Sequence, residues 1–143
     1  MLKQIHSKPS ILLVDDDPED RELLMHAFLQ ITDEHHLTSL QSGKMLMDLL
    51  AHIDDRELPC LIVLDSNMPE INGKQTLKLL QDNPRYQQIP KIIYSTSSLV
   101  RDRVECLSLG AKDYLVKPNS VNEILHAARK MLDHCDAYRK RIA

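Results

Sequence analysis

The chain has 143 residues, of which 43% are hydrophobic and 27% charged, and its formal net charge at pH 7 is −3. This length and composition are those of one globular domain that can fold without disulfides or a structural metal, and they exclude a disordered chain. The slight acidity argues against a nucleic-acid-binding surface, and no apolar run approaches the roughly 20 residues that span a bilayer, so neither DNA nor a membrane is an expected partner.

Short apolar runs alternate with helical patterns along the chain. The first run, 11–14, precedes residues that recur at helical spacing from Leu23 to Ile31, and a weaker strand candidate at 37–40 precedes a second helical pattern from Leu46 to Ile53. Further along, strands are expected at 60–64, 92–94 and 114–116, and helices at 74–82, 99–109 and 121–141.

Continuous apolar strands indicate burial on both faces of a sheet. About five repeats of strand then helix predict an α/β fold, a doubly wound parallel sheet with right-handed crossovers and helices on both faces. The sequence contains no linker, low-complexity tract or internal repeat. We therefore expect a single domain over residues 1–143, with its core at about 10–135 and no output domain.

The cysteines and the first residues indicate the compartment. Cys60, Cys106 and Cys135 are odd in number, far apart and outside any C-x-x-C pattern, so we expect buried thiols rather than a disulfide framework or a zinc site. Residues 1–10 hold no apolar stretch between their lysines, which argues against a secretory signal and for a cytoplasmic protein. The three glycines lie too far apart for a glycine-rich phosphate loop.

Polar side chains follow four of the predicted strands at the point where each strand ends. In chain order they are Asp15 and Asp16, Asp65, Ser95 and Thr96, and Lys117. Because the carboxyl ends of parallel strands form one edge of a sheet, these side chains should share one rim. Clustered carboxylates repel each other unless a cation neutralises them, and Mg²⁺ prefers such oxygen ligands. A carboxylate can also accept a phosphoryl group, and a lysine and a hydroxyl would assist that transfer.

These residues and their neighbours resemble the receiver domains of bacterial two-component response regulators. The resemblance covers about residues 10–135 and rests on Leu13-Val14-Asp15-Asp16, on Leu64-Asp65-Ser66-Asn67-Met68-Pro69 followed by Gly73, on Ser95, and on Tyr114-Leu115-Val116-Lys117-Pro118. It implies a flavodoxin-like sheet of five strands in the order 2-1-3-4-5. Lengthened loops at 56–59 and 83–89 are similar to those of single-domain regulators that partner bacterial phytochromes.

The resemblance implies a phosphorylation site with a metal beside it. Asp65 would accept a phosphoryl group from the phosphohistidine of a sensor histidine kinase or hybrid kinase. Mg²⁺ would be bound by Asp65, by Asp16 directly, by Asp15 through water, and by the backbone carbonyl of Asn67.

The resemblance also implies a switch. Ser95 would bind a phosphoryl oxygen, Lys117 would pair with the phosphate, and Tyr114 would turn inward as the Ser95 hydroxyl shifts. The Lys117-Pro118 bond would be cis and aim the lysine inward. Thr96 is the alternative hydroxyl if the alignment shifts by one residue.

The expected function is a phosphorylation-dependent signalling module that catalyses only its own phosphorylation and dephosphorylation. A separate downstream protein or a phosphotransfer protein would receive the signal, and by analogy with the family the fourth and fifth helices would offer a homodimer face. A phosphatase of the haloacid-dehalogenase type is the enzymatic alternative. It needs a second acid two residues after the nucleophile, where this chain has Asn67, which cannot transfer protons. A degenerate receiver that binds partners without phosphorylation is the third possibility.

Other polar residues have simpler explanations. Asp17 before Pro18 is typical of a helix cap, and Glu19 and Asp20 are typical of an acidic first turn. The seven histidines, among them His35-His36, show no metal-ligand spacing, so we expect them in solvent or in the core.

Overall fold

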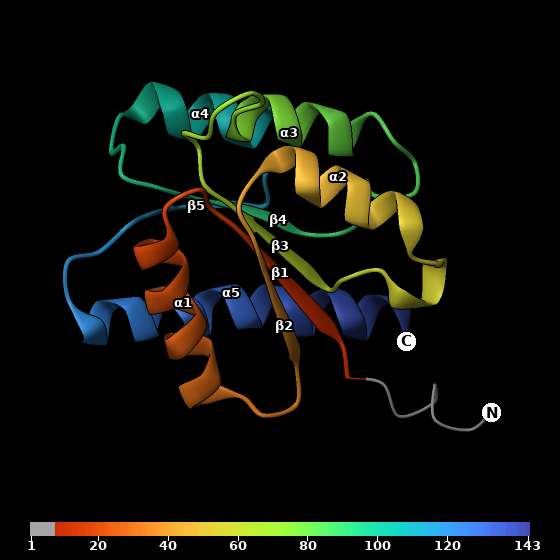
Figure 1. The fold of residues 1–143 in the computed structure, drawn as a ribbon, viewed down its shortest axis with the longest axis horizontal. Helices are drawn as coiled ribbons and strands as arrows, with labels where there is room; N and C mark the ends of the chain where they lie inside the picture. Colours follow the sequence, from red (N-terminus) through yellow and green to blue (C-terminus); the bar gives the residue numbers. More distant parts are fainter. Residues whose placement is uncertain (1–7) are drawn as a thin grey trace.

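The computed structural model describes residues 8–143, in which a parallel sheet lies between two layers of helices (Figure 1). In chain order the elements are β1 (Ser10–Val14), α1 (Pro18–Ile31), β2 (His36–Leu40), α2 (Gly43–His52), the 3₁₀ turn η2 (Asp55–Glu57), β3 (Leu61–Leu64), α3 (Gly73–Gln81), β4 (Lys91–Ser95), α4 (Val100–Ser108), β5 (Asp113–Val116) and α5 (Val121–Ile142).

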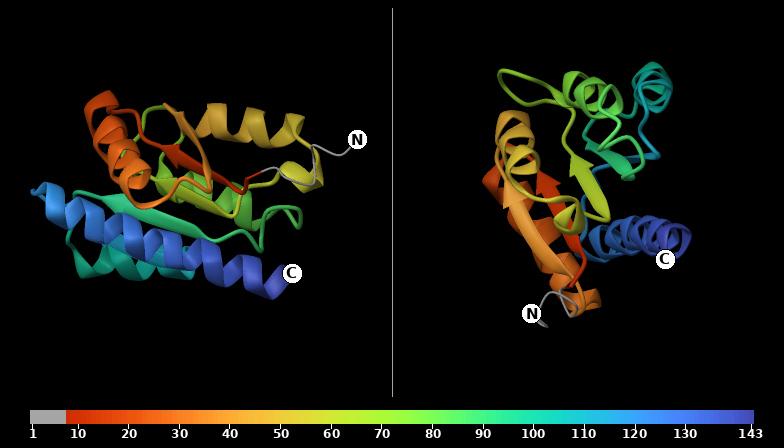
Figure 2. Two further views of the ribbon diagram at one scale, coloured as in Figure 1. Left: turned by 90° about the horizontal axis from the view of Figure 1, so that it is seen from below. Right: turned by 90° about the vertical axis from the view of Figure 1, so that its right-hand side faces the viewer.

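The strands lie in the order β2-β1-β3-β4-β5, and every neighbouring pair is parallel. Helices α1 and α5 cover one face, and α2, α3 and α4 cover the other (Figures 1 and 2). The predicted α/β class, the doubly wound sheet and the 2-1-3-4-5 order are therefore confirmed. Each crossover returns the chain to the same end of the sheet, so the carboxyl ends of all five strands form one edge.

The two faces of the sheet explain why the strands read as unbroken apolar runs. In β1, Ile11 and Leu13 pack against the α1 and α5 side, while Leu12 and Val14 pack against the side of α2 and α3. Because helices cover both faces, successive residues of the inner strands β1, β3 and β4 are buried alike.

The beginnings of the helices follow local capping rules. Asp17 accepts hydrogen bonds from the N–H groups of Glu19 and Asp20 in front of Pro18, which confirms the predicted cap of α1. Asn72 and Gln75 form a capping box at the start of α3. At the far end of α4, Gly110 has φ +109°, the left-handed conformation that the predicted C-cap glycine requires.

The prediction of free thiols was wrong for two of the cysteines. Cys60 and Cys135 form a disulfide with Cα atoms 5.0 Å apart, and only Cys106 is free and buried as expected. The pairing joins residues 75 positions apart, because α5 crosses the sheet next to the start of β3. Spacing along the chain cannot reveal such a contact.

Two further expectations concern the backbone and the membrane. The Lys117–Pro118 bond is trans, since residues 8–143 contain no cis peptide, so the expected cis bond was wrong. The position of the Lys117 backbone is instead fixed by the end of β5, where its N–H donates a hydrogen bond to the Ser95 carbonyl at 2.7 Å. No helix in the described part of the chain is both long and apolar enough to cross a membrane.

Candidate functional site

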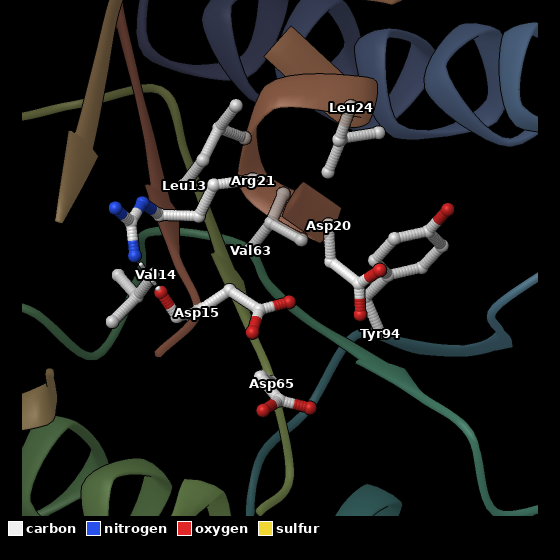
Figure 3. Close-up of a pocket in the computed structure, with 9 residues that line it drawn as sticks. All are labelled: Leu13, Val14, Asp15, Asp20, Arg21, Leu24, Val63, Asp65 and Tyr94. Carbon is white, nitrogen blue, oxygen red and sulfur yellow. Dashed lines mark hydrogen bonds between the residues drawn. The ribbon is translucent and has the colours of Figure 1, made fainter. Parts of the chain in front are cut away.

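Three carboxylates meet at the carboxyl edge of the sheet. Asp15 and Asp16 follow β1 and Asp65 follows β3, its neighbour in the sheet, so the strand order itself brings them together. One oxygen from each lies within 4.8 Å of the others. Asp15 and Asp65 are only 6% and 7% exposed, whereas Asp16 faces solvent. The side chains of Asp15 and Asp65 lie next to each other (Figure 3).

Lys117 joins these carboxylates from the end of β5. Its Nζ donates hydrogen bonds to Asp15 Oδ2 at 2.7 Å and to Asp20 Oδ2 at 2.8 Å, and it lies 3.4 Å from Asp65 Oδ1. Asp20 is therefore part of the site, and its assignment to an acidic helix start alone was incomplete. It lies one turn after the cap of α1, on the side of the helix that faces the strand ends.

Burial shifts the pKa values at this site in a way that favours a cation. Burial, and then repulsion from Asp15, raises the pKa of Asp65 to about 6, although Lys117 opposes the shift. Burial likewise raises the pKa of Asp15. Burial disfavours the charged form of Lys117, but hydrogen bonds to Asp15 and Asp20 outweigh it and raise the pKa of the lysine. Three carboxylates around one ammonium, with Asp16 beside them, leave excess negative charge.

The donor set fits a hard divalent cation. All the clustered ligand atoms are carboxylate oxygens, and the exposed side of Asp16 leaves room for the bound waters that Mg²⁺ retains. Asn67 lies two residues beyond Asp65, and its backbone N–H lowers the pKa of that carboxyl. Beside the carboxylates, a cavity of about 10 Å³ lies between Asp20, Tyr94 and the strands, enough for about one water molecule (Figure 3).

The structure separates the two candidate hydroxyls. Ser95 is the last residue of β4 and fully buried, and its Oγ lies 2.6 Å from the Oγ of Ser66, the residue after Asp65. Ser95 Oγ also accepts a hydrogen bond from the N–H of Ser97 at 3.0 Å. Thr96 is exposed. The hydroxyl that faces the Asp65 loop is therefore that of Ser95.

Tyr114 belongs to the same hydrogen-bond network. It is 2% exposed, and its hydroxyl donates to the carbonyl of Ser97 at 2.8 Å. Any movement of the Ser95–Ser97 segment must therefore move or break a hydrogen bond of Tyr114. Arg103 of α4 donates to the Tyr114 carbonyl at 3.1 Å, which links the network to that helix.

A polar bridge between α3 and α4 was not found by sequence reasoning. Asp102 accepts hydrogen bonds from Ser97 Oγ at 2.5 Å and from Lys74 Nζ at 3.2 Å, and Lys74 also pairs with Glu105 at 2.7 Å. These residues read as ordinary charged positions on helices. The one sequence feature that could have indicated this bridge is the position of Lys74, directly after Gly73 in the first turn of α3 and next to the Asp65 loop.

Comparison with known proteins finds a matching family profile and similar solved structures. The profile described as "Response regulator receiver domain" matches residues 11–129. Response regulator Rre1 of Synechocystis sp. is 30% identical over 123 residues, which are 86% of this chain and 51% of Rre1, so the chain spans about half of that relative.

Among solved structures, the Mn²⁺-bound form of response regulator Rcp1 is 28% identical, with a TM-score of 0.74 over 85% of this chain and 90% of that one. The phosphorylated cyanobacterial phytochrome response regulator RcpA, at 24% identity, has a TM-score of 0.78 over 87% of this chain and 91% of its own, which shows the shared fold.

Proposed function

The chain belongs to the response regulator receiver domain family, and we propose that Asp65 is the phosphoacceptor of this phosphorylation-dependent signalling module. One observation carries the assignment. Asp65 is the carboxylate at the end of the central strand β3, buried between Asp15 and the ammonium of Lys117. Asp15 and Asp20 also contact Lys117, but of these three carboxylates only Asp65 follows the central strand β3.

The phosphoryl donor is a phosphohistidine on a sensor or hybrid histidine kinase. An oxygen of Asp65 attacks the phosphorus, the P–N bond breaks, and the imidazole leaves with the bonding electrons and takes up a proton. With a pKa of about 6, Asp65 is mostly ionised at pH 7 and can act as the nucleophile. Lys117 then pairs with an oxygen of the new phosphoryl group.

The metal in this proposal is Mg²⁺, held by Asp15, Asp16, Asp65 and the backbone carbonyl of Asn67. When bound, it neutralises negative charge on the carboxylates and on the phosphoryl oxygens. The family resemblance supplies Asn67, and the clustered oxygens of the three aspartates support the rest.

The proposed switch uses the network of Ser95 and Tyr114. A phosphoryl group on Asp65 draws the Ser95 hydroxyl away from Ser66 and toward the phosphoryl oxygens, and the Ser97 segment follows. The Tyr114 hydroxyl donates a hydrogen bond to the Ser97 carbonyl, so this movement lengthens or breaks that hydrogen bond. The free energy of phosphorylation thus shifts an equilibrium between two conformations that present different surfaces.

The surface that changes lies next to exposed apolar side chains. On and around α4 and β5 these are Leu99, Val100, Val104, Leu107, Val116 and Val121. We place here the contact with a downstream or phosphotransfer protein, and the homodimer contact between the fourth and fifth helices of two copies.

Since the kinase reaction uses ATP, the proposed location is the cytoplasm. Light scattering before and after phosphorylation tests the homodimer, and an unchanged mass would contradict it.

The site assignment is tested by phosphate incorporation from acetyl phosphate. We expect labelling that requires Mg²⁺ and is lost in Asp65→Asn, while Asp48→Asn, an exposed aspartate of α2, labels like the wild type. Labelling that survives in Asp65→Asn would mean another phosphoacceptor. Absence of labelling in the wild type would favour a degenerate receiver, and turnover of a generic phosphate ester would favour the phosphatase.

A further inference from the structure

A second cluster of ligand-type side chains lies at the amino end of the sheet, opposite the Asp65 site. His35 directly precedes β2, Cys60 directly precedes β3, and Cys135 lies on α5. A ring nitrogen of His35 and the two Sγ atoms lie within 4.8 Å of one another. Both cysteines are at most 4% exposed, so the cluster is formed inside the protein and not on its surface.

The His35 ring is turned into this cluster with one nitrogen unpaired. Its side chain is 7% exposed, and Nε2 has no hydrogen-bond partner among the described residues. On the other side of the ring, Nδ1 lies 2.6 Å from Thr32 Oγ1. When Nδ1–H donates to that oxygen, Nε2 carries the free lone pair, which is the tautomer that a metal ligand needs. Buried polar atoms without a partner are rare in proteins, so this nitrogen indicates a missing ligand.

We propose that His35, Cys60 and Cys135 bind Zn²⁺ when the Cys60–Cys135 disulfide is reduced, with Asp136 as the fourth ligand. Asp136 Oδ1 lies 3.9 Å from His35 Nε2, and its side chain is 53% exposed. Two thiolates, an imidazole and a carboxylate suit tetrahedral Zn²⁺, whereas Mg²⁺ avoids sulfur and nitrogen ligands. The two ends of the sheet would thus hold different ions.

The electron and proton balance of the site is simple. A dithiol reductant gives two electrons and two protons to the disulfide, which becomes two thiols, while the reductant forms its own disulfide. Binding of the ion then releases both thiol protons to solvent. The sulfurs separate to the roughly 3.7 Å expected for two thiolates on a tetrahedral ion, and the His35 imidazole would supply the third ligand.

The ion also has a route to the cluster. Cys60 and Arg139 line a hollow of about 880 Å³ at the amino ends of the strands. The disulfide and the ion are alternatives at one place, and each connects β3 to α5. The ion would add β2, through His35, to that connection.

Cobalt titration of the reduced chain tests the proposal. The full chain is reduced with a phosphine without oxygen, and saturating Mg²⁺ occupies the acidic edge. We expect one equivalent of Co²⁺ to give thiolate-to-cobalt charge-transfer bands and the strong visible bands of a tetrahedral ion, both removed by Zn²⁺. The oxidised chain should give neither.

Matched variants assign the ligands. His35→Gln and Asp136→Asn should weaken Co²⁺ binding by about 10-fold or more, and Cys135→Ser should lose charge-transfer intensity. His36→Gln, at the exposed next residue, and Cys106→Ser should behave like the wild type.

Three results would overturn the proposal. In the first, the reduced protein is folded but gives no thiolate-to-cobalt bands with Co²⁺. In the second, His35→Gln gives the same bands as the wild type. In the third, the reduced chain loses its circular dichroism and does not regain it with Zn²⁺. Labelling of Asp65 by acetyl phosphate in the oxidised chain is independent of all three, so failure of the zinc site and failure of the phosphorylation site are distinguishable.

Discussion

At the scale of single residues, Lys91 is a buried charge that takes no part in the phosphorylation site. Lys91 begins β4 and is 1% exposed, and burial lowers its pKa to about 8. Its Nζ donates to the Gln87 carbonyl at 2.9 Å and to Gln81 Oε1 at 3.3 Å. Both acceptors are neutral, and no carboxylate of residues 8–143 pairs with the ammonium, so its burial destabilises the folded state at neutral pH.

Lys91→Met should therefore stabilise the protein by up to about 3 kcal/mol at pH 7, less the hydrogen bonds that it loses. The unfolded lysine keeps its proton up to about pH 10.5, so between pH 8 and 10.5 the unfolded state binds more protons than the folded state. Wild-type stability then rises relative to the variant, and the difference shrinks over that window. Urea unfolding across this range measures it, with exposed Lys112→Met as control. A difference that stays constant with pH would contradict this explanation.

Ser95 and Thr96 are adjacent hydroxyls with different environments. Ser95→Ala should slow phosphorylation by acetyl phosphate about 10-fold or more, because a hydrogen bond to a charged oxygen is lost. Thr96→Ala should stay within about twofold of the wild type, since Thr96 is exposed. Rates of labelling under saturating Mg²⁺ distinguish the two. The reverse order of effects would assign the switch to Thr96.

At the scale of elements, the approach of α3 to the end of β3 positions Asp65. A Cβ on Gly73 would lie 2.6 Å from the Asp65 carbonyl oxygen and 2.8 Å from Ser66 Cα. Gly73→Ala must move that backbone, so we expect a loss of about 1–3 kcal/mol of stability together with slower labelling. Gly110→Ala, strained by its positive φ, should lose about 1–2 kcal/mol but label normally. Thermal unfolding measures the stability of both variants, and the rate of labelling by acetyl phosphate measures the effect on Asp65. Equal labelling rates in the two variants would show that the α3 approach does not position Asp65.

Much of the fold and site could be predicted from the sequence at this scale. The apolar runs and the polar residues after them located the five strands and placed Asp15, Asp65 and Lys117 on one edge, because parallel crossovers bring those ends together. Besides the polar bridge between α3 and α4, two contacts could not be predicted. Asp20 already satisfied the pattern of a helix start, and the Cys60–Cys135 pair depends on where α5 crosses the sheet.

At the scale of the whole molecule, one covalent bond connects the middle of the chain to its last helix. The disulfide spans 75 residues, and closing a loop of that length in the unfolded state is worth about 4 kcal/mol in the chain-entropy account. Reduction in metal-free buffer should lower the free energy of unfolding by about 2–4 kcal/mol. Cys106→Ser should show the same loss on reduction, because Cys106 is not in the bond. Equal urea midpoints for reduced and oxidised protein would contradict this role.

We propose that the acidic edge of the sheet carries one phosphoacceptor, Asp65. The most direct test of this proposal is peptide mass spectrometry after incubation with acetyl phosphate and Mg²⁺. We predict a mass increase of one phosphoryl group on the peptide that contains Asp65 and on no other, removed by mild alkali as an acyl phosphate requires. A phosphoryl group on the peptide that contains Asp15 and Asp16, or an alkali-stable product, would contradict the account.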